Sequence, residues 1–276
     1  MEETDGRAAR RATVFPLLLI LVLLAFTALL PLARGDTLRW LGLRDVWALL
    51  GGGPDRFRDP FDDAGVLAEA GDPRESVSDG WWLNSGGYFV VEDGIGRTLA
   101  GELAETDPWF RRYATSNPID SDLGYHPQNV FRLITRDSWR DVREEVRFRI
   151  RKLHPSESPQ RAESNGVLLM ARYRGKDDLY YAGLRVDGRA IVKKKVGGRY
   201  LTLAEKPVYA NDAPYDRAAN PILLPLERWI GLRTTVRNDE SGGVFIRLDL
   251  REDDAAAWTP IIEVHDDGRS RGPGIT

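Results

Sequence analysis

Hydrophobic and polar residues alternate with a period of two in short runs over most of the chain after Ser78. The clearest run covers residues 142–152, where Val142, Val146 and Phe148 fall on one face and arginines fall on the other. Because successive side chains of a strand point to opposite faces, this run predicts a strand with one face in a core and one in solvent. Similar runs between glycine, asparagine and aspartate turns predict strands at residues 87–91, 129–135, 166–173, 179–186, 190–196, 200–204, 229–237, 244–251 and 261–265.

These runs predict the fold class. About ten strands without an intervening helical pattern are typical of two packed antiparallel sheets. The turn Asp187-Gly188 joins residues 179–186 to residues 190–196 as a hairpin, and Gly197-Gly198 leads into a third strand of the same meander. We therefore expect residues 55–276 to form one all-β, two-sheet antiparallel sandwich with few helices.

A hydrophobic segment precedes the alternating pattern. Residues 14–33 contain no charged side chain, and Arg7, Arg10 and Arg11 come shortly before them. Their length is that of an α-helix crossing the hydrocarbon core of a bilayer. A cleaved signal peptide is the alternative, but small residues at suitable cleavage positions are hard to find. We expect an uncleaved transmembrane anchor at residues 14–33, a short cytoplasmic tail at residues 1–13 and an extracytoplasmic C-terminal domain.

Residues 34–54 lie between the anchor and the β domain. Their leucines fall near one helical face, and Trp40 and Trp47 are available for the headgroup level of a membrane. This pattern favours an interfacial helix, and a plain extension of the anchor is the alternative. Residues 51–54 (GGGP) then end any helix and predict a linker.

Composition removes several function classes. The chain has no cysteine, so a disulfide framework and a thiolate metal site are excluded. The formal net charge of −3 gives no reason to expect a nucleic acid partner. With only His126, His154 and His265, a multi-histidine metal centre is not expected. The fold must therefore depend on its hydrophobic core.

Four stretches of the β domain carry a resemblance to a known superfamily. They are residues 60–63 (PFDD), 81–87 (WWLNSGG), 165–173 (NGVLLMARY) and 229–236 (WIGLRTTV). In this order they resemble the concanavalin A-like lectin and glucanase superfamily, which includes laminin G-like modules and family 16 glycoside hydrolases. The resemblance implies a jelly-roll sandwich that holds a carbohydrate. In such folds a last strand returns beside the first, and the loop-like ending at Thr276 leaves open whether that strand is missing.

The sequence does not carry the paired carboxylates of a family 16 hydrolase. The nearest pair, Glu144-Glu145, consists of strand neighbours that point to opposite faces and cannot act together. The resemblance also leaves a polysaccharide lyase acting on a uronate-containing glycan as an alternative, because residues 180–183 (YYAG) partly match a lyase strand motif. Its candidate catalytic residues are His126, Tyr181 and Arg185. For His126 the alternative is a structural loop.

Cationic residues recur on the polar faces of the predicted strands. If these strands pair as neighbours, their side chains converge on one sheet face, where guanidinium groups suit the carboxylates or sulfates of an anionic glycan. The alternative is an ordinary solvated face neutralised by Glu145, Asp187 and Asp249. Tyr173 and Tyr180 are expected in the core. The candidate glycan-binding residues are Arg147, Arg149, Arg172, Arg185, Lys193, Lys195 and Tyr181.

Asp59, Asp62 and Asp63 are candidate calcium ligands, because calcium prefers carboxylate oxygens and jelly rolls of this group often hold a structural ion near the first strand. A turn stabilised by aspartate side chains is the alternative. No other cofactor is expected. The leading hypothesis is a membrane-anchored, non-catalytic carbohydrate-binding sandwich, and the alternatives are the lyase and a laminin G-like protein-interaction domain.

Overall fold

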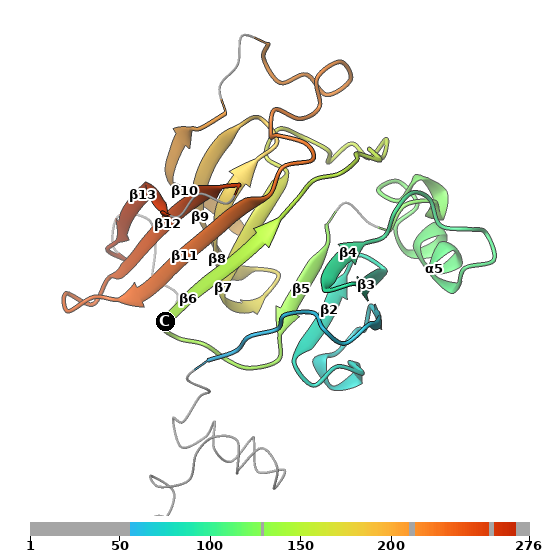
Figure 1. Cartoon of the computed structure of the whole chain (residues 1–276), viewed down its shortest axis with the longest axis horizontal. Coiled ribbons are helices and arrows are strands. Elements are labelled where there is room, and N and C mark those ends of the chain that lie inside the picture. The colour runs from blue at the N-terminus through green and yellow to red at the C-terminus, as the bar shows by residue number, and fades with distance from the viewer. Residues whose placement is uncertain (1–55, 128–129, 210–212, 254–256, 269–276) are drawn as a thin grey trace, which may run out of the picture. The chain divides into compact units, whose positions relative to one another are not determined.

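A computed structural model describes residues 56–276 except 128–129, 210–212, 254–256 and 269–276 (Figure 1). The predicted anchor at residues 14–33 and the predicted interfacial segment at residues 34–54 lie outside the described residues. Within the described part of the chain, no helix is both long and apolar enough to cross a bilayer. The chain divides into two compact units, residues 1–57 and 58–276, and the second unit carries everything that follows.

Eight strands form two four-stranded antiparallel sheets, which appear as two layers in Figure 1. One has the order β10-β9-β8-β7 and the other has the order β13-β12-β11-β6. The all-β sandwich is therefore confirmed, whereas the jelly-roll order stays a prediction. The strands are β6 Val142–Phe148, β7 Gly166–Gly175, β8 Asp178–Arg185, β9 Arg189–Val196, β10 Arg199–Pro207, β11 Ile230–Asn238, β12 Val244–Glu252 and β13 Thr259–Asp266.

The inner faces of the two sheets share one hydrophobic core. Ala182, Leu184 and Val192 come from one sheet, and Leu232 and Ile246 come from the other, all buried in the same cluster. Burial of one such side chain stabilises the fold by about 1.5–3 kcal/mol, so this cluster is the main source of stability. Because the inner faces pack together, the two outer faces lie on opposite sides of the sandwich.

The residues before β6 form two smaller sheets and a short helix. Strands β1, β3 and β4 make one sheet, and β2 and β5 make the other. The helix was not predicted from the sequence. It begins where the Asp107 side chain accepts a hydrogen bond from the Trp109 amide, and it buries Trp109 and Tyr113. The elements are β1 Gly65–Ala68, β2 Trp81–Ser85, β3 Tyr88–Glu92, β4 Ile95–Thr98, α5 Pro108–Ser116, β5 Arg132–Thr135, and the 3-10 turns η2 Pro73–Glu75 and η3 Asp122–Gly124.

The stretch of residues 81–87 that contributed to the resemblance has a structural role. Gly86 and Gly87 adopt positive φ values of 118° and 75° in the turn between β2 and β3. Their amides donate to Oε2 of Glu69 at 2.9 and 3.0 Å, and the Tyr113 hydroxyl donates to the same oxygen. A Cβ atom at Gly86 would come within 2.6 Å of Phe131, so the turn requires glycine there.

Candidate functional site

The outer face of the β7–β10 sheet combines the exposed Tyr200 and the half-buried Tyr181 with cations. Along β8 and β9, alternation sends Tyr180 and Lys194 inward, while their neighbours point to the outer face. Cross-strand pairing aligns the outward residues, because Tyr181 pairs with Lys193 and Lys195 pairs with Tyr200. We call Tyr181, Lys193, Lys195 and Tyr200 the Tyr–Lys strip.

Tyr200 is the most accessible part of this strip. The residue is 60% exposed, and its ring centroid lies 4.5 Å from Nζ of Lys195 and 6.0 Å from Nζ of Lys193. The Tyr181 ring lies 6.1 Å away, centroid to centroid. Burial, together with the neighbouring Tyr200, raises the pKa of the Tyr181 phenol. That phenol therefore stays protonated at neutral pH and can donate a hydrogen bond.

A cluster of paired charges occupies the other end of the same face. The Arg185 guanidinium binds Asp187 at 2.7 Å and Glu205 at 3.0 Å. The Arg189 guanidinium also binds Glu205, and the Arg189 amide donates to Asp187 at 3.3 Å. The Arg185 side chain is only 11% exposed, so its charge is already engaged. Arg185 therefore organises this end of the sheet and offers little free charge to a ligand.

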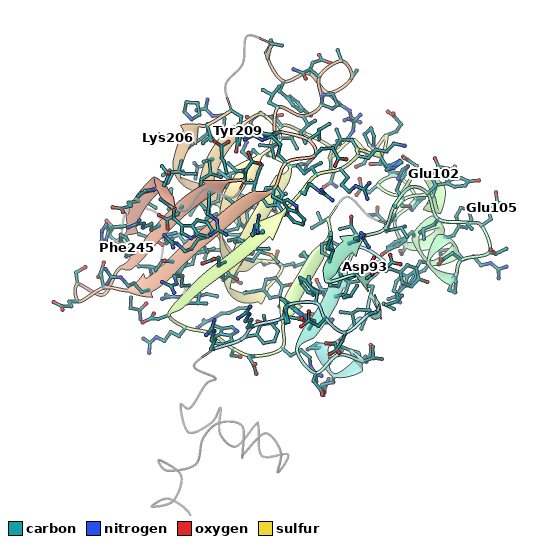
Figure 2. The ribbon with its side chains drawn as sticks, in the orientation of Figure 1. Asp93, Glu102, Glu105, Lys206, Tyr209 and Phe245 are labelled. Carbon is teal, nitrogen blue, oxygen red and sulfur yellow. The ribbon has the colours of Figure 1, made fainter. Side chains whose placement is uncertain are left out.

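A pocket adjoins the charge cluster at the turn between β8 and β9. Its volume is about 400 Å³, and both the turn and the loop around Tyr215 contribute to its walls. Figure 2 labels Lys206, one residue before the pocket residue Pro207 at the end of β10, and Tyr209, two residues after it. We call this hollow the turn pocket. It is lined by Glu163, Asp187, Gly188, Arg189, Pro207, Ala213, Pro214, Tyr215 and Leu223.

The expected single cationic face is not formed, because the strands that carry the cations belong to two different sheets. Arg147, on the outer face of β6, stacks over Trp229 at 5.6 Å, and Arg149, which follows β6, stacks over the same ring at 5.0 Å. On the same sheet, Arg233 and Arg251 lie 4.6 Å from the Trp258 ring. Arg147 and Arg149 are therefore separated by the sandwich core from Tyr181, Arg185, Lys193 and Lys195.

Arg172 does not lie on either outer face, so its expected place among surface cations is wrong. A bulge interrupts β7 after Ala171, and Arg172 adopts a φ of 51° in the left-handed region. This conformation turns its side chain inward, where it is 2% exposed and binds Asp141 at 3.0 Å and the Arg140 carbonyl oxygen at 2.9 Å. Arg172 is therefore a structural tie between β7 and the start of β6.

The candidate catalytic residues are not brought together. His126 lies in the loop after η3, where its Nε2 is 3.3 Å from the Asp122 carboxylate and its amide donates to Ser121. Tyr181 and Arg185 stand on the outer face of β8, four residues apart and about 13 Å along the strand. As expected, Glu144 and Glu145 point to opposite faces of β6.

The candidate calcium ligands do not form a cluster. Asp59 accepts hydrogen bonds from the Phe61 amide at 2.7 Å and from the Trp81 indole at 2.6 Å, as in a turn stabilised by an aspartate side chain. Asp62 and Asp63 are exposed. Among the residues that the structure describes, no group of three histidine, aspartate or glutamate side chains is placed to hold a metal ion.

Two polar side chains lie inside the sandwich, and their burial was not predicted from the sequence. Oε2 of Glu144 is buried and has no hydrogen-bond partner among the described residues. Lys194 forms a fully buried ion pair with Asp266. The alternation contains the signal for both, since Glu144 stands between Val142 and Val146 and Lys194 stands between two inward valines. A charged residue at an inward position of an alternating strand therefore indicates a polar group inside the sandwich.

Comparison with protein-family models and with curated proteins found no match. Among solved structures, the chain is similar to a carbohydrate-binding module, CBM66, from Bacillus subtilis, with 16% identity over 69% of this chain and 81% of that chain and a TM-score of 0.34. The two four-stranded sheets, and not this likeness, define the class of protein as an antiparallel β-sandwich.

Proposed function

We propose that this chain is a non-catalytic carbohydrate-binding β-sandwich that holds an acidic glycan on the Tyr–Lys strip. The observation that carries the proposal is the exposed Tyr200 ring with two lysine ammonium groups beside it on one sheet face. An aromatic ring offers a flat apolar surface to a sugar, and an ammonium group attracts a carboxylate or sulfate.

The charge balance of the strip favours an acidic glycan over a neutral one. Lys193 makes no ion pair with a carboxylate among the described residues, and Lys195 lies 3.6 Å from Asp177. The side chain of Lys193 is therefore available to an incoming anion. Tyr200 is 60% exposed on the outer face of the sheet, and such an accessible ring suits a polymer that lies along the face.

The binding test uses the purified full-length chain and electrophoretic retardation in gels that contain a polyuronate or a sulfated polysaccharide. Tyr200→Ala should weaken retention about fivefold, because the sugar loses the apolar surface of the ring, and burial of about 40 Å² of such surface contributes about 1 kcal/mol. The matched control is Arg237→Ala, whose guanidinium stacks on Phe245 of the opposite sheet. Equal retention of the wild type and the Tyr200 variant across all acidic polymers would contradict the proposal.

We also propose that residues 14–33 anchor the domain in a membrane with the sandwich on the extracytoplasmic side. The charge-free length of that segment supports this part. Protease added to intact cells should digest the sandwich while the N-terminal tail stays protected, and alkaline carbonate should leave the chain in the membrane fraction. Release of the full chain by carbonate would contradict the anchor.

A further inference from the structure

The turn pocket differs from the Tyr–Lys strip in its charge balance. Three carboxylates, those of Glu163, Asp187 and Glu205, stand in or beside it with two guanidinium groups, those of Arg185 and Arg189. Both arginines are held by carboxylates, whereas the Glu163 carboxylate makes no hydrogen bond or ion pair with the described residues. An anionic ligand would meet excess negative charge in this pocket.

The remaining walls are apolar or aromatic. Pro207, Pro214 and Leu223 supply hydrocarbon surface, and Tyr215 supplies a ring. A volume of about 400 Å³ lies within the range of small-ligand sites, which are mostly apolar with a few polar groups that fix orientation. Paired carboxylates and guanidinium groups offer both acceptors and donors, and vicinal hydroxyl groups need both at once.

The pocket is also built on fixed backbone. The Gly188 carbonyl oxygen accepts hydrogen bonds from the amides of Val208 and Tyr209 at 3.0 and 2.8 Å. On the other side, the Leu223 amide donates to Val186 at 2.6 Å. These bonds hold the β8–β9 turn against the residues after β10 and against the segment at Leu223. These two walls are therefore ordered before a ligand enters, which lowers the free-energy cost of binding.

We infer that the turn pocket binds one neutral sugar unit, with Asp187 and Arg189 on its hydroxyl groups and Tyr215 along its apolar face. The inference rests on the proposed glycan-binding function and deepens it. Arg189 and Lys193 share the outer face of β9 and stand about 13 Å apart along the strand. One glycan can therefore place a neutral residue in the pocket and an acidic residue on the strip, which predicts a polymer of mixed neutral and acidic units.

The test measures binding of free monosaccharides to the full-length chain by saturation-transfer NMR. The probes are glucose, galactose and mannose with their matching uronates. At least one neutral hexose should bind saturably and more tightly than its uronate. Asp187→Asn replaces the Asp-Gly turn by Asn-Gly, which favours the same type of turn. It should weaken hexose binding at least about tenfold, because a charge-assisted hydrogen bond to the sugar is lost. Tyr215→Ala, at the pocket rim, should also weaken it.

The control is Arg237→Ala, on the opposite sheet, which should bind the hexose as the wild type does. Tighter binding of the uronate than of the hexose would overturn the inference, as would wild-type hexose binding by both pocket variants. If retention of acidic polymers depends on Tyr200 but no hexose binds, the inference about the turn pocket is wrong and the proposed function still holds. Retention that is independent of Tyr200 would instead remove the proposed function.

Discussion

The first feature at the residue scale is Glu144, a carboxyl group buried inside the β-sandwich. Its side chain lies on the core face of β6 opposite Thr234, and burial raises its pKa to about 8 from 4.5. Between these two values the folded chain holds a proton that the unfolded chain has released. The free energy of unfolding should therefore fall by about 1.4 kcal/mol per unit as pH rises through that interval, and level off above pH 8.

Glu144→Gln removes this titration and should flatten the pH dependence and raise stability at neutral pH. Urea unfolding at several pH values from 5 to 9 measures the effect. Glu145→Gln, on the exposed face of the same strand, is the matched control and should keep the wild-type slope. The same slope in the wild type and in Glu144→Gln would contradict the assignment.

The ion pair of Lys194 and Asp266 is the second residue-scale feature. Nζ of Lys194 lies 2.7 Å from the Asp266 carboxylate with both side chains 0% exposed, and the Tyr180 hydroxyl donates to that carboxylate at 2.6 Å. Asp266→Ala would leave a buried ammonium without its counter-ion, so it should cost about 3–5 kcal/mol in the free energy of unfolding. The double variant Lys194→Met, Asp266→Leu should recover most of that loss. Urea unfolding measures the free energy of unfolding of both variants. A cost of under about 1 kcal/mol for Asp266→Ala would contradict the argument.

At the scale of elements, the two turns around β9 allow a matched comparison. Gly188 and Gly197 both have positive φ, at 78° and 54°. A Cβ atom at Gly188 would collide with the Tyr209 carbonyl oxygen, whereas one at Gly197 would meet no atom of the described residues within 4 Å. Gly197→Ala should cost about 1 kcal/mol from backbone strain alone, and Gly188→Ala should cost at least about 1 kcal/mol more. Thermal unfolding measures both, and equal costs would show that the turn is not packed as described.

The elements also show which features the sequence predicts. Strands β8, β9, β11 and β12 match the expected ranges to within a residue or two, because alternation reports directly on a strand with one buried face. Alternation carries no information on which sheet a strand joins, so Arg147 and Lys193 were expected on one face. The bulge at Arg172 has no sequence signal of this kind. The helix α5 did have sequence signals that were missed because they are not alternation, namely the Asp107-Pro108 start and the buried residues Trp109 and Tyr113 four positions apart.

At the scale of the whole molecule, the proposed site divides into a part for an acidic sugar unit and a part for a neutral one on one sheet face. The strip offers the Lys193 ammonium group to an acidic unit, while in the turn pocket both arginines are paired and the carboxylate of Glu163 adds negative charge. Salt distinguishes the binding of the acidic unit from the binding of the neutral unit, because only the first depends on charge attraction. The Debye length falls from about 10 Å to about 3 Å between about 0.1 M and about 1 M salt.

Retention of an acidic polymer by the wild-type chain should therefore weaken at least about tenfold over that salt range, while hexose binding in the pocket should stay constant. Lys193→Gln should lower polymer retention at low salt and reduce its salt dependence, because one of the screened charges is gone. Both readouts come from one protein preparation, by gel retardation and by saturation-transfer NMR. Hexose binding that weakens with salt, or polymer retention that does not change with salt, would contradict the inference. Either result would mean that the strip does not bind the acidic unit while the pocket binds the neutral one.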